Sequence, residues 1–315
     1  MSEFYGDTRR LGRRTLQSTG GLGLAGAGAY LYHAGPRLFR QYRNEMKRPV
    51  EPAKFRPDAY NWPNKGLQAA WLGHSTVLLR IDGFTILTDP VFSVRAGVHL
   101  GLVTIGVKRL TAPALPVEAL PKIDLILLSH AHMDHFDTPS LRALENHRTT
   151  VVTAPRTSDL LHVGQFRAVH EVGWRQEVRV GAIRVQGLEV NHWGARFRTD
   201  TYRGYTGYLI DTGRYRVVFA GDTADCSYFR EVGGADLAIM PIGAYNPWIR
   251  FHCTPEQAWR MAREARAERI LPVHHKTFLL SREPLVEPIE RLVHAAGSAN
   301  EDAIVLREIG QEFKI

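Results

Sequence analysis

Four side chains that can bind a metal ion lie within six residues of one another near the middle of the chain. They are His130, His132, Asp134 and His135, and they follow an apolar run at 123–128 that is typical of a buried strand. Imidazole nitrogen and carboxylate oxygen together suit zinc, and suit iron or manganese less exclusively. His130 and His132 can converge on one ion while Asp134 and His135 turn towards a second. The spacing therefore predicts a metal site rather than a solvated loop with incidental histidines.

Three more potential ligands each stand just past a predicted strand. They are His192, Asp222 and His274. Any one of them alone could be an ordinary packed residue. Together with the four clustered side chains they complete the ligand set of a site assembled from strand ends.

The elements that must position these residues are short strands separated by turns. Thr254 and Gln257 form a capping-box pattern that begins a helix to about Ala267, and Pro139 lies in the first turn of another helix at 137–146. Two successive sets of strands, each closed by helices, predict an α/β fold, an αββα four-layer sandwich over residues 56–315. The predicted strands are 69–72, 76–81, 84–87, 123–128, 150–153, 168–171, 183–190, 207–211, 216–220, 237–241 and 270–273.

The positive charge of the chain is concentrated in its first residues. The 315 residues carry a net charge of +8, but residues 1–54 hold ten Lys and Arg against four Asp and Glu, which leaves the body nearly neutral. A neutral body argues against a nucleic-acid interface, which needs a clustered basic face. Two cysteines, Cys226 and Cys253, cannot form a disulfide framework.

Residues 1–55 form a separate basic and partly apolar extension. Paired arginines at 9–10 and 13–14 precede a glycine-rich apolar run at 20–32. This layout is typical of a twin-arginine export signal, left in place as an anchor or removed. A segment lying on a membrane surface and a plain extension packed on the body are the alternatives. We therefore expect a membrane-associated or exported protein, and otherwise a cytoplasmic one.

The ligand pattern, with five further motifs, resembles the metallo-β-lactamase superfamily. Within it, the chain is most similar to the branch that contains N-acyl-phosphatidylethanolamine-hydrolysing phospholipase D, over about residues 55–290. The motifs are WLGHST at 71–76, LTDPVFS at 87–93, FAGDT at 219–223, PIGAY at 241–245 and HCTPEQA at 252–258. Ser75 replaces an expected alanine, and His275-Lys276 replaces an expected Trp-Gly pair. These departures lie beside the site, so they affect the expected substrate more than the expected chemistry.

The resemblance implies two zinc ions per chain and a metallo-β-lactamase-like fold. It implies that one zinc is held by His130, His132 and His192, that the other is held by Asp134, His135 and His274, and that Asp222 bridges the two. A pair of zinc ions lowers the pKa of water to about 7 and so supplies hydroxide at neutral pH.

Three other side chains, besides Asp134, are expected to assist the chemistry. We expect Asp134 to orient the attacking water and accept its proton. His252 is expected to contact the substrate oxyanion or the leaving group, although a packed histidine is an equal alternative. His74 and Asp89 are expected to hydrogen-bond the ligands and orient them.

The expected function is a phosphodiesterase of the phospholipase D type, with a phospholipid or another small ester as substrate. A lactonase or carboxylic-ester hydrolase of the same superfamily is one alternative, and a metal-binding protein without turnover is another. The loop at 193–205 combines basic and aromatic residues that could hold a phosphate head group, or it could be a solvated surface loop. The sequence leaves open which metal is loaded and the oligomeric state.

Overall fold

A computed structural model describes residue 45, residues 47–101 and residues 103–315 of the chain. Val50–Ile315 forms one unit with its own core. The predicted signal or anchor segment falls mostly on residues 1–44 and 46, which lie outside the described residues. Among the residues that are described, no helix is both long enough and apolar enough to cross a membrane.

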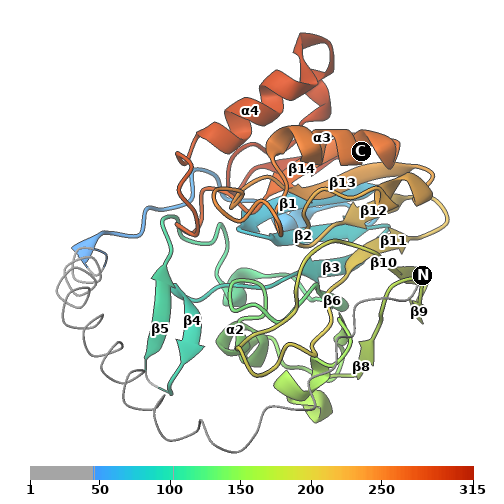
Figure 1. Ribbon diagram of the computed structural model, residues 1–315. Helices are drawn as coiled ribbons and strands as arrows, with labels where there is room; N and C mark the ends of the chain where they lie inside the picture. Colours follow the sequence, from blue (N-terminus) through green and yellow to red (C-terminus); the bar gives the residue numbers. More distant parts are fainter. Residues whose placement is uncertain (1–44, 46, 102) are drawn as a thin grey trace, which may run out of the picture. The chain divides into compact units, whose positions relative to one another are not determined.

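The first of two large sheets has seven strands (Figure 1). The Asp82-Gly83 turn joins two of them as an antiparallel hairpin, as its sequence favours. Strands β3, β6, β7 and β8 run parallel, so their carboxyl ends meet at one edge of the sheet. The strand order is β15 (Glu312–Lys314), β1 (Leu67–Gly73), β2 (Thr76–Ile81), β3 (Phe84–Thr88), β6 (Leu125–Leu128), β7 (Thr150–Thr153) and β8 (Ala168–Glu171).

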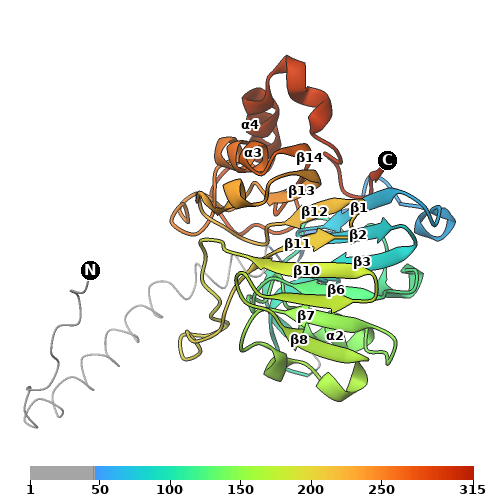
Figure 2. The same cartoon turned by 90° about the vertical axis from the view of Figure 1, so that its right-hand side faces the viewer.

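The second large sheet has six strands and packs on the first (Figure 2). Strands β9 to β12 are antiparallel, whereas β12, β13 and β14 are parallel. The order is β14 (Ala267–Val273), β13 (Ala235–Pro241), β12 (Arg216–Phe219), β11 (Gly207–Asp211), β10 (Ile183–Leu188) and β9 (Glu177–Val180). Fully buried side chains from both sheets, among them Leu127 and Ile239, share one core between the sheets.

Helices lie on the outer sides of the two sheets (Figures 1 and 2). Helix α3 (Pro255–Glu264) begins with the predicted capping box and packs with α4 (Glu287–Ala296) over a second core beneath β13 and β14. Helix α2 (Thr138–Ala143) lies beside the first sheet. Short 3-10 turns occur at Ala59–Asn61, Val117–Ala119, Ser158–Leu160, Val163–Gln165, Tyr228–Glu231 and Ser298–Ala303. The predicted four-layer α/β sandwich is confirmed.

The structure also contains elements that the sequence did not predict. A separate hairpin of β4 (Arg95–His99) and β5 (Thr104–Lys108) extends beside the first sheet, and β9, β15 and α4 add to the layers. The helix predicted at 137–146 ends early, because the Asn146 side chain hydrogen-bonds Thr149 and turns the chain towards β7. Likewise, α3 ends at Glu264 rather than near Ala267, which already belongs to β14.

Candidate metal centre

The predicted metal-binding residues lie on loops where the two sheets meet. The cluster from His130 to His135 connects β6 to α2, and Asp222 follows β12 of the other sheet. The remaining residues come from further loops: His74 between β1 and β2, Asp89 after β3, His192 after β10, His252 between β13 and α3, and His274 after β14. Most of these residues follow strands of the parallel parts of the sheets, as expected for sites at strand carboxyl ends, whereas His74 and His192 follow antiparallel strands.

One glycine permits the close approach of the two sheets at this site. Gly221 has a φ of +61°, and a Cβ atom there would lie 2.6 Å from Cβ of Ser129. Any other residue would push the end of β12 away from the end of β6. The glycine before Asp222 is therefore required to bring that carboxylate against the histidine cluster.

Three imidazoles converge on one side of the centre. Nε2 of His130 lies 2.8 Å from Nδ1 of His132, and Nε2 of His192 lies 3.3 Å from the same atom. All three rings are mostly buried, and their nitrogens face one another with no carboxylate between His130 and His132. Three nitrogens at such distances form a set that can bind one cation.

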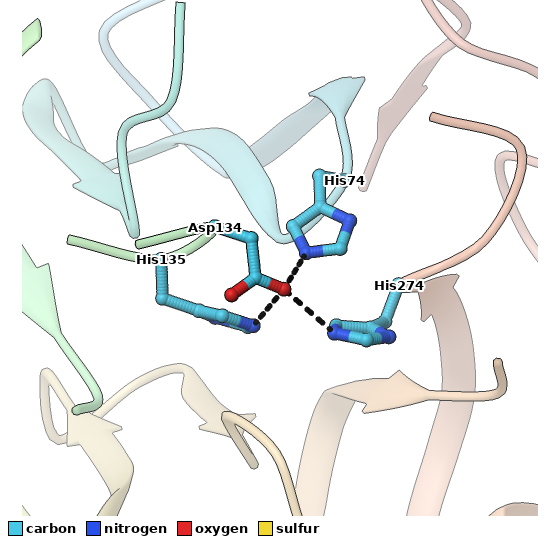
Figure 3. Close-up of side chains that lie close together, drawn as sticks. All are labelled: His74, Asp134, His135 and His274. Carbon is cyan, nitrogen blue, oxygen red and sulfur yellow. Dashed lines mark hydrogen bonds and ion pairs between the residues drawn. The ribbon is translucent and has the colours of Figure 1, made fainter. Parts of the chain in front are cut away.

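A second group surrounds the carboxylate of Asp134 (Figure 3). Its Oδ2 atom lies 3.0 Å from Nε2 of His74 and 3.6 Å from Nε2 of both His135 and His274. From the sequence, His74 was expected to hydrogen-bond a metal ligand and orient it. The structure brings its ring into the four-residue group itself, where it contacts Asp134 directly.

Asp222 lies between these two groups. Its Oδ2 atom is 3.1 Å from Nε2 of His135 and 3.1 Å from Nε2 of His274. It is also 3.9 Å from Nε2 of His130 and 3.8 Å from Nε2 of His192. A single carboxylate oxygen thus faces both groups of imidazoles, which is the position that a bridging ligand needs.

The buried polar atoms of the centre fit a metal ion better than they fit one another. Nε2 of His135, Nε2 of His274, Oδ1 of Asp222 and Nδ1 of His252 are all buried and make no hydrogen bond within the described residues. A buried polar atom without a partner costs free energy. Several such atoms aimed at one small space indicate a cation as their common partner.

The imidazoles of the first group are held neutral. Burial lowers the pKa of His132 to about 4, and it lowers the pKa of His130 and of His192 well below the ordinary value. Neutral imidazole is the form that binds metals.

The carboxylates of the centre are held ionised. Burial alone would raise the pKa of Asp134 and Asp222, but His135 and His274 outweigh it and keep both values well below the usual range. In return, the carboxylates overcome the effect of burial on His274 and raise its pKa to about 9. The two carboxylates therefore favour positive charge between them.

Asp89 orients one histidine of each group. Its Oδ2 accepts hydrogen bonds from Nδ1 of His135 at 2.6 Å and from Oγ of Ser129 at 2.6 Å. Oγ of Ser129 lies in turn 2.8 Å from Nδ1 of His130. With Nδ1 occupied in both rings, Nε2 is left with a lone pair facing the centre. Ser129 belongs to this arrangement although the sequence analysis did not assign it a role.

Three residues of the centre have unusual backbone conformations. His74, Asp89 and His274 have φ angles of 51°, 31° and 63°, in the left-handed region that non-glycine residues rarely adopt. Each such residue costs roughly 1–3 kcal/mol, and strain of this kind clusters at functional sites.

Comparisons with known proteins agree with this geometry. The model of the beta-lactamase superfamily domain matches residues 85–275. The chain belongs to the metallo-β-lactamase superfamily. An uncharacterized protein of Mycobacterium tuberculosis is 33% identical over 272 residues, covering 81% of this chain and 71% of that protein.

Several curated relatives with named activities are hydrolases. The N-acyl-phosphatidylethanolamine-hydrolyzing phospholipase D 1 of Caenorhabditis elegans is 30% identical over 248 residues, covering 72% of this chain and 69% of the enzyme. The crystal structure of an isothiocyanate hydrolase from Delia radicum gut bacteria shares the fold, with a TM-score of 0.62 at 16% identity over 78% of this chain and 98% of that one. This member of the superfamily is therefore a metal-dependent hydrolase.

The metallo-β-lactamase centre of this chain opens into a pocket of about 320 Å³. Apolar side chains make much of its wall, and Asp134, Asp222 and His252 face it. His252 is buried, burial lowers its pKa to about 4, and its Nδ1 lies 3.9 Å from Oδ2 of Asp222. The apolar wall includes three residues that sequence reasoning missed: Met133, Trp248 and Leu280.

The loop at 193–205 contributes to this pocket only in part. Trp193 and Arg196 line it, and the Arg196 guanidinium is held by the carbonyl oxygens of Ala131 and Phe136 at 3.0 and 2.8 Å. Arg203 instead pairs with acidic side chains, Asp159 and Asp200, at 2.6 and 2.7 Å, and so is not available to a head group.

Proposed function

We propose that this chain is a dinuclear-zinc phosphodiesterase that hydrolyses N-acyl-phosphatidylethanolamines or related phospholipids. The observation that carries the proposal is the carboxylate of Asp222 between two groups of imidazoles, next to a pocket with an apolar wall. The similarity to the Caenorhabditis elegans phospholipase D supports the choice of substrate. A binding site for a diacyl lipid needs such an apolar wall, whereas a sugar lactone needs a small polar site.

The residues present suit two zinc ions. His130, His132 and His192 would hold one ion, Asp134, His135 and His274 the other, and Asp222 would contact both. Zinc bound in this way supplies hydroxide at neutral pH and stabilises negative charge on the substrate oxygens.

The side chains around the ions would position the substrate and move protons. Asp134 contacts three histidines through Oδ2, while Oδ1 has none of these contacts (Figure 3) and can accept the proton of the attacking water. His252 faces the pocket from the opposite loop and can donate a hydrogen bond to a phosphate oxygen. Arg196, fixed by two carbonyl oxygens, places a positive charge near the phosphate.

The test is hydrolysis by purified full-length chain of an N-acyl-phosphatidylethanolamine, an aryl phosphodiester and a lactone in parallel. We expect cleavage of both phosphodiesters, lost with a chelator and restored by zinc. Asp222→Asn should lose this activity, whereas the matched control Asp137→Asn should retain it, because the buried Asp137 accepts hydrogen bonds from Ser93 and Ser140 and belongs to none of the metal-binding groups found among the described residues. Cleavage of the lactone alone would refute the proposed substrate.

We also propose that residues 1–55 place the enzyme at a membrane or export it. The paired arginines at 13–14 and the apolar run after them support this. Fractionation of cells that produce the chain with both arginines changed to glutamine tests it, because this change removes the arginine pair and its charge. Unchanged distribution between membrane, exported and cytoplasmic fractions would contradict the proposal.

A further inference from the structure

A second pocket, of about 430 Å³, lies at the opposite edge of the first sheet. Strands β3, β6, β7 and β8 are parallel and in register, with Leu125 beside Thr150 and Thr150 beside Ala168. Residues at the amino ends of these strands therefore line one rim. Phe84, at the start of β3, forms part of the wall.

This pocket is remote from the metal centre. The chain runs along β6 from Leu125 at the rim to His130 at the centre, and five extended residues span roughly 16 Å. A ligand in this pocket would not touch the metal-binding residues.

The pocket carries an excess of positive charge. Lys122, Arg148, Arg167, His170 and Arg179 line it, and Asp124 is its single acidic residue. Lys122 already pairs with Asp124 at 2.8 Å. Within the described part of the chain, the three arginine side chains form no ion pair with an acidic residue.

This arrangement differs from that of a neighbouring arginine. Arg184 on β10 lies opposite Arg179 in the β9–β10 pair, bonds Asp211 at 2.6 Å and lies 3.6 Å from Glu177. The arginine next to the pocket is thus balanced by carboxylates, whereas those that line the pocket are not. Three guanidinium groups around one hollow repel one another unless an anion neutralises them.

We propose that this pocket binds a ligand that bears phosphate groups. A guanidinium offers paired N–H donors that match phosphate oxygens, so three arginines suit a ligand with more than one phosphate. The volume is that of a small organic molecule, and Phe84 offers an apolar surface for its carbon skeleton. A free organic phosphate and the head group of a phosphoinositide lipid share this chemistry.

The experiment compares two double variants of the full-length, metal-loaded chain. Arg167→Gln/Arg179→Gln removes charge from the pocket. Arg56→Gln/Arg142→Gln removes the same charge from exposed positions that do not line it. The first probe is pyrophosphate, whose binding is measured by calorimetry. The second is phosphatidylcholine vesicles with or without phosphatidylinositol bisphosphate, whose binding is measured by co-sedimentation. Phosphate oxygens can also bind zinc at the metal centre, which is the same in both variants. The affinities of the two variants for each probe are therefore compared with each other.

We expect the pocket variant to bind pyrophosphate about tenfold more weakly or worse, and the control variant to bind it as the wild type does. Pyrophosphate binding that the pocket variant weakens identifies a free phosphate as the ligand, and a loss confined to vesicles with phosphatidylinositol bisphosphate identifies a head group. Both variants should hydrolyse the aryl phosphodiester at the wild-type rate, so the outcome is independent of the proposed function. Equal binding by the two variants, or no binding of either probe by the wild type, overturns the proposal.

Discussion

Replacing Asp89 by asparagine should weaken metal binding although Asp89 does not face the metal-binding space. Its carboxylate is fully buried and accepts three hydrogen bonds, from the backbone nitrogen of Ser129 at 2.7 Å, from its hydroxyl at 2.6 Å and from Nδ1 of His135 at 2.6 Å. An asparagine keeps one oxygen, which can still accept from the Ser129 backbone. Its amide group would then face Nδ1 of His135 as a second donor.

The expected magnitude follows from the tautomer of His135. To accept from the new amide, Nδ1 must lose its proton, and Nε2 then carries the proton and has no lone pair for a metal ion. The same change breaks the contact through Ser129 that orients His130. Loss of such orienting partners lowers metal affinity by about 10–100-fold. The lost hydrogen bond to a charged group should also lower the free energy of unfolding by about 1.5–3 kcal/mol.

The assay is competition for zinc with a chromogenic chelator, with urea unfolding in parallel. Asp137→Asn is the matched control, since Asp137 is buried, accepts hydrogen bonds from the hydroxyls of Ser93 and Ser140, and lies in none of the metal-binding groups in the described part of the chain. Both variants should lose stability, and Asp89→Asn alone should lose metal affinity. Equal zinc affinity in the two variants would refute the argument from tautomers.

Three further predictions concern the fold and the pocket. Leu127 is fully buried, so Leu127→Ala should lower the free energy of unfolding by about 2–5 kcal/mol; a smaller loss in urea unfolding would mean that the core collapses around the gap. Hydrogen bonds from Arg291 outweigh the effect of burial and lower the pKa of Glu256 from 4.5 to about 2. Their contribution to the free energy of unfolding is therefore present above pH 4.5 and is lost as the pH falls towards 2. Because this pair is half-exposed, the destabilisation by Glu256→Gln at pH 6 should be below about 1 kcal/mol and should shrink at pH 3; an effect independent of pH would contradict this assignment. Trp248→Ala should raise KM for an N-acyl-phosphatidylethanolamine but not for a small aryl phosphodiester, and an equal change for both substrates would exclude an acyl-binding role.

Strand prediction succeeded where the side-chain pattern was unambiguous. The strands at Thr76–Ile81, Thr150–Thr153 and Gly207–Asp211 have the predicted bounds, because apolar or alternating runs between turn residues specify them locally. The β4–β5 hairpin was missed. A glycine stands at the centre of each strand, Gly97 and Gly106, where it weakens the strand signal, and the described residues of the hairpin form a two-stranded sheet of their own.

The sequence by itself determined the chemistry of the candidate centre and the four-layer fold. The motif from His130 to His135 is local, and each further candidate ligand follows a strand whose periodicity is visible along the chain. Only the tertiary structure decided how these residues meet: that Asp222 lies between two groups of imidazoles, that His74 joins one group, and that Ser129 links Asp89 to His130. The tertiary structure also brings three arginines from separate strand ends together around one pocket, although the body of the chain is nearly neutral in charge. Strand order and loop conformation set these distances, and both depend on packing between residues far apart in the chain.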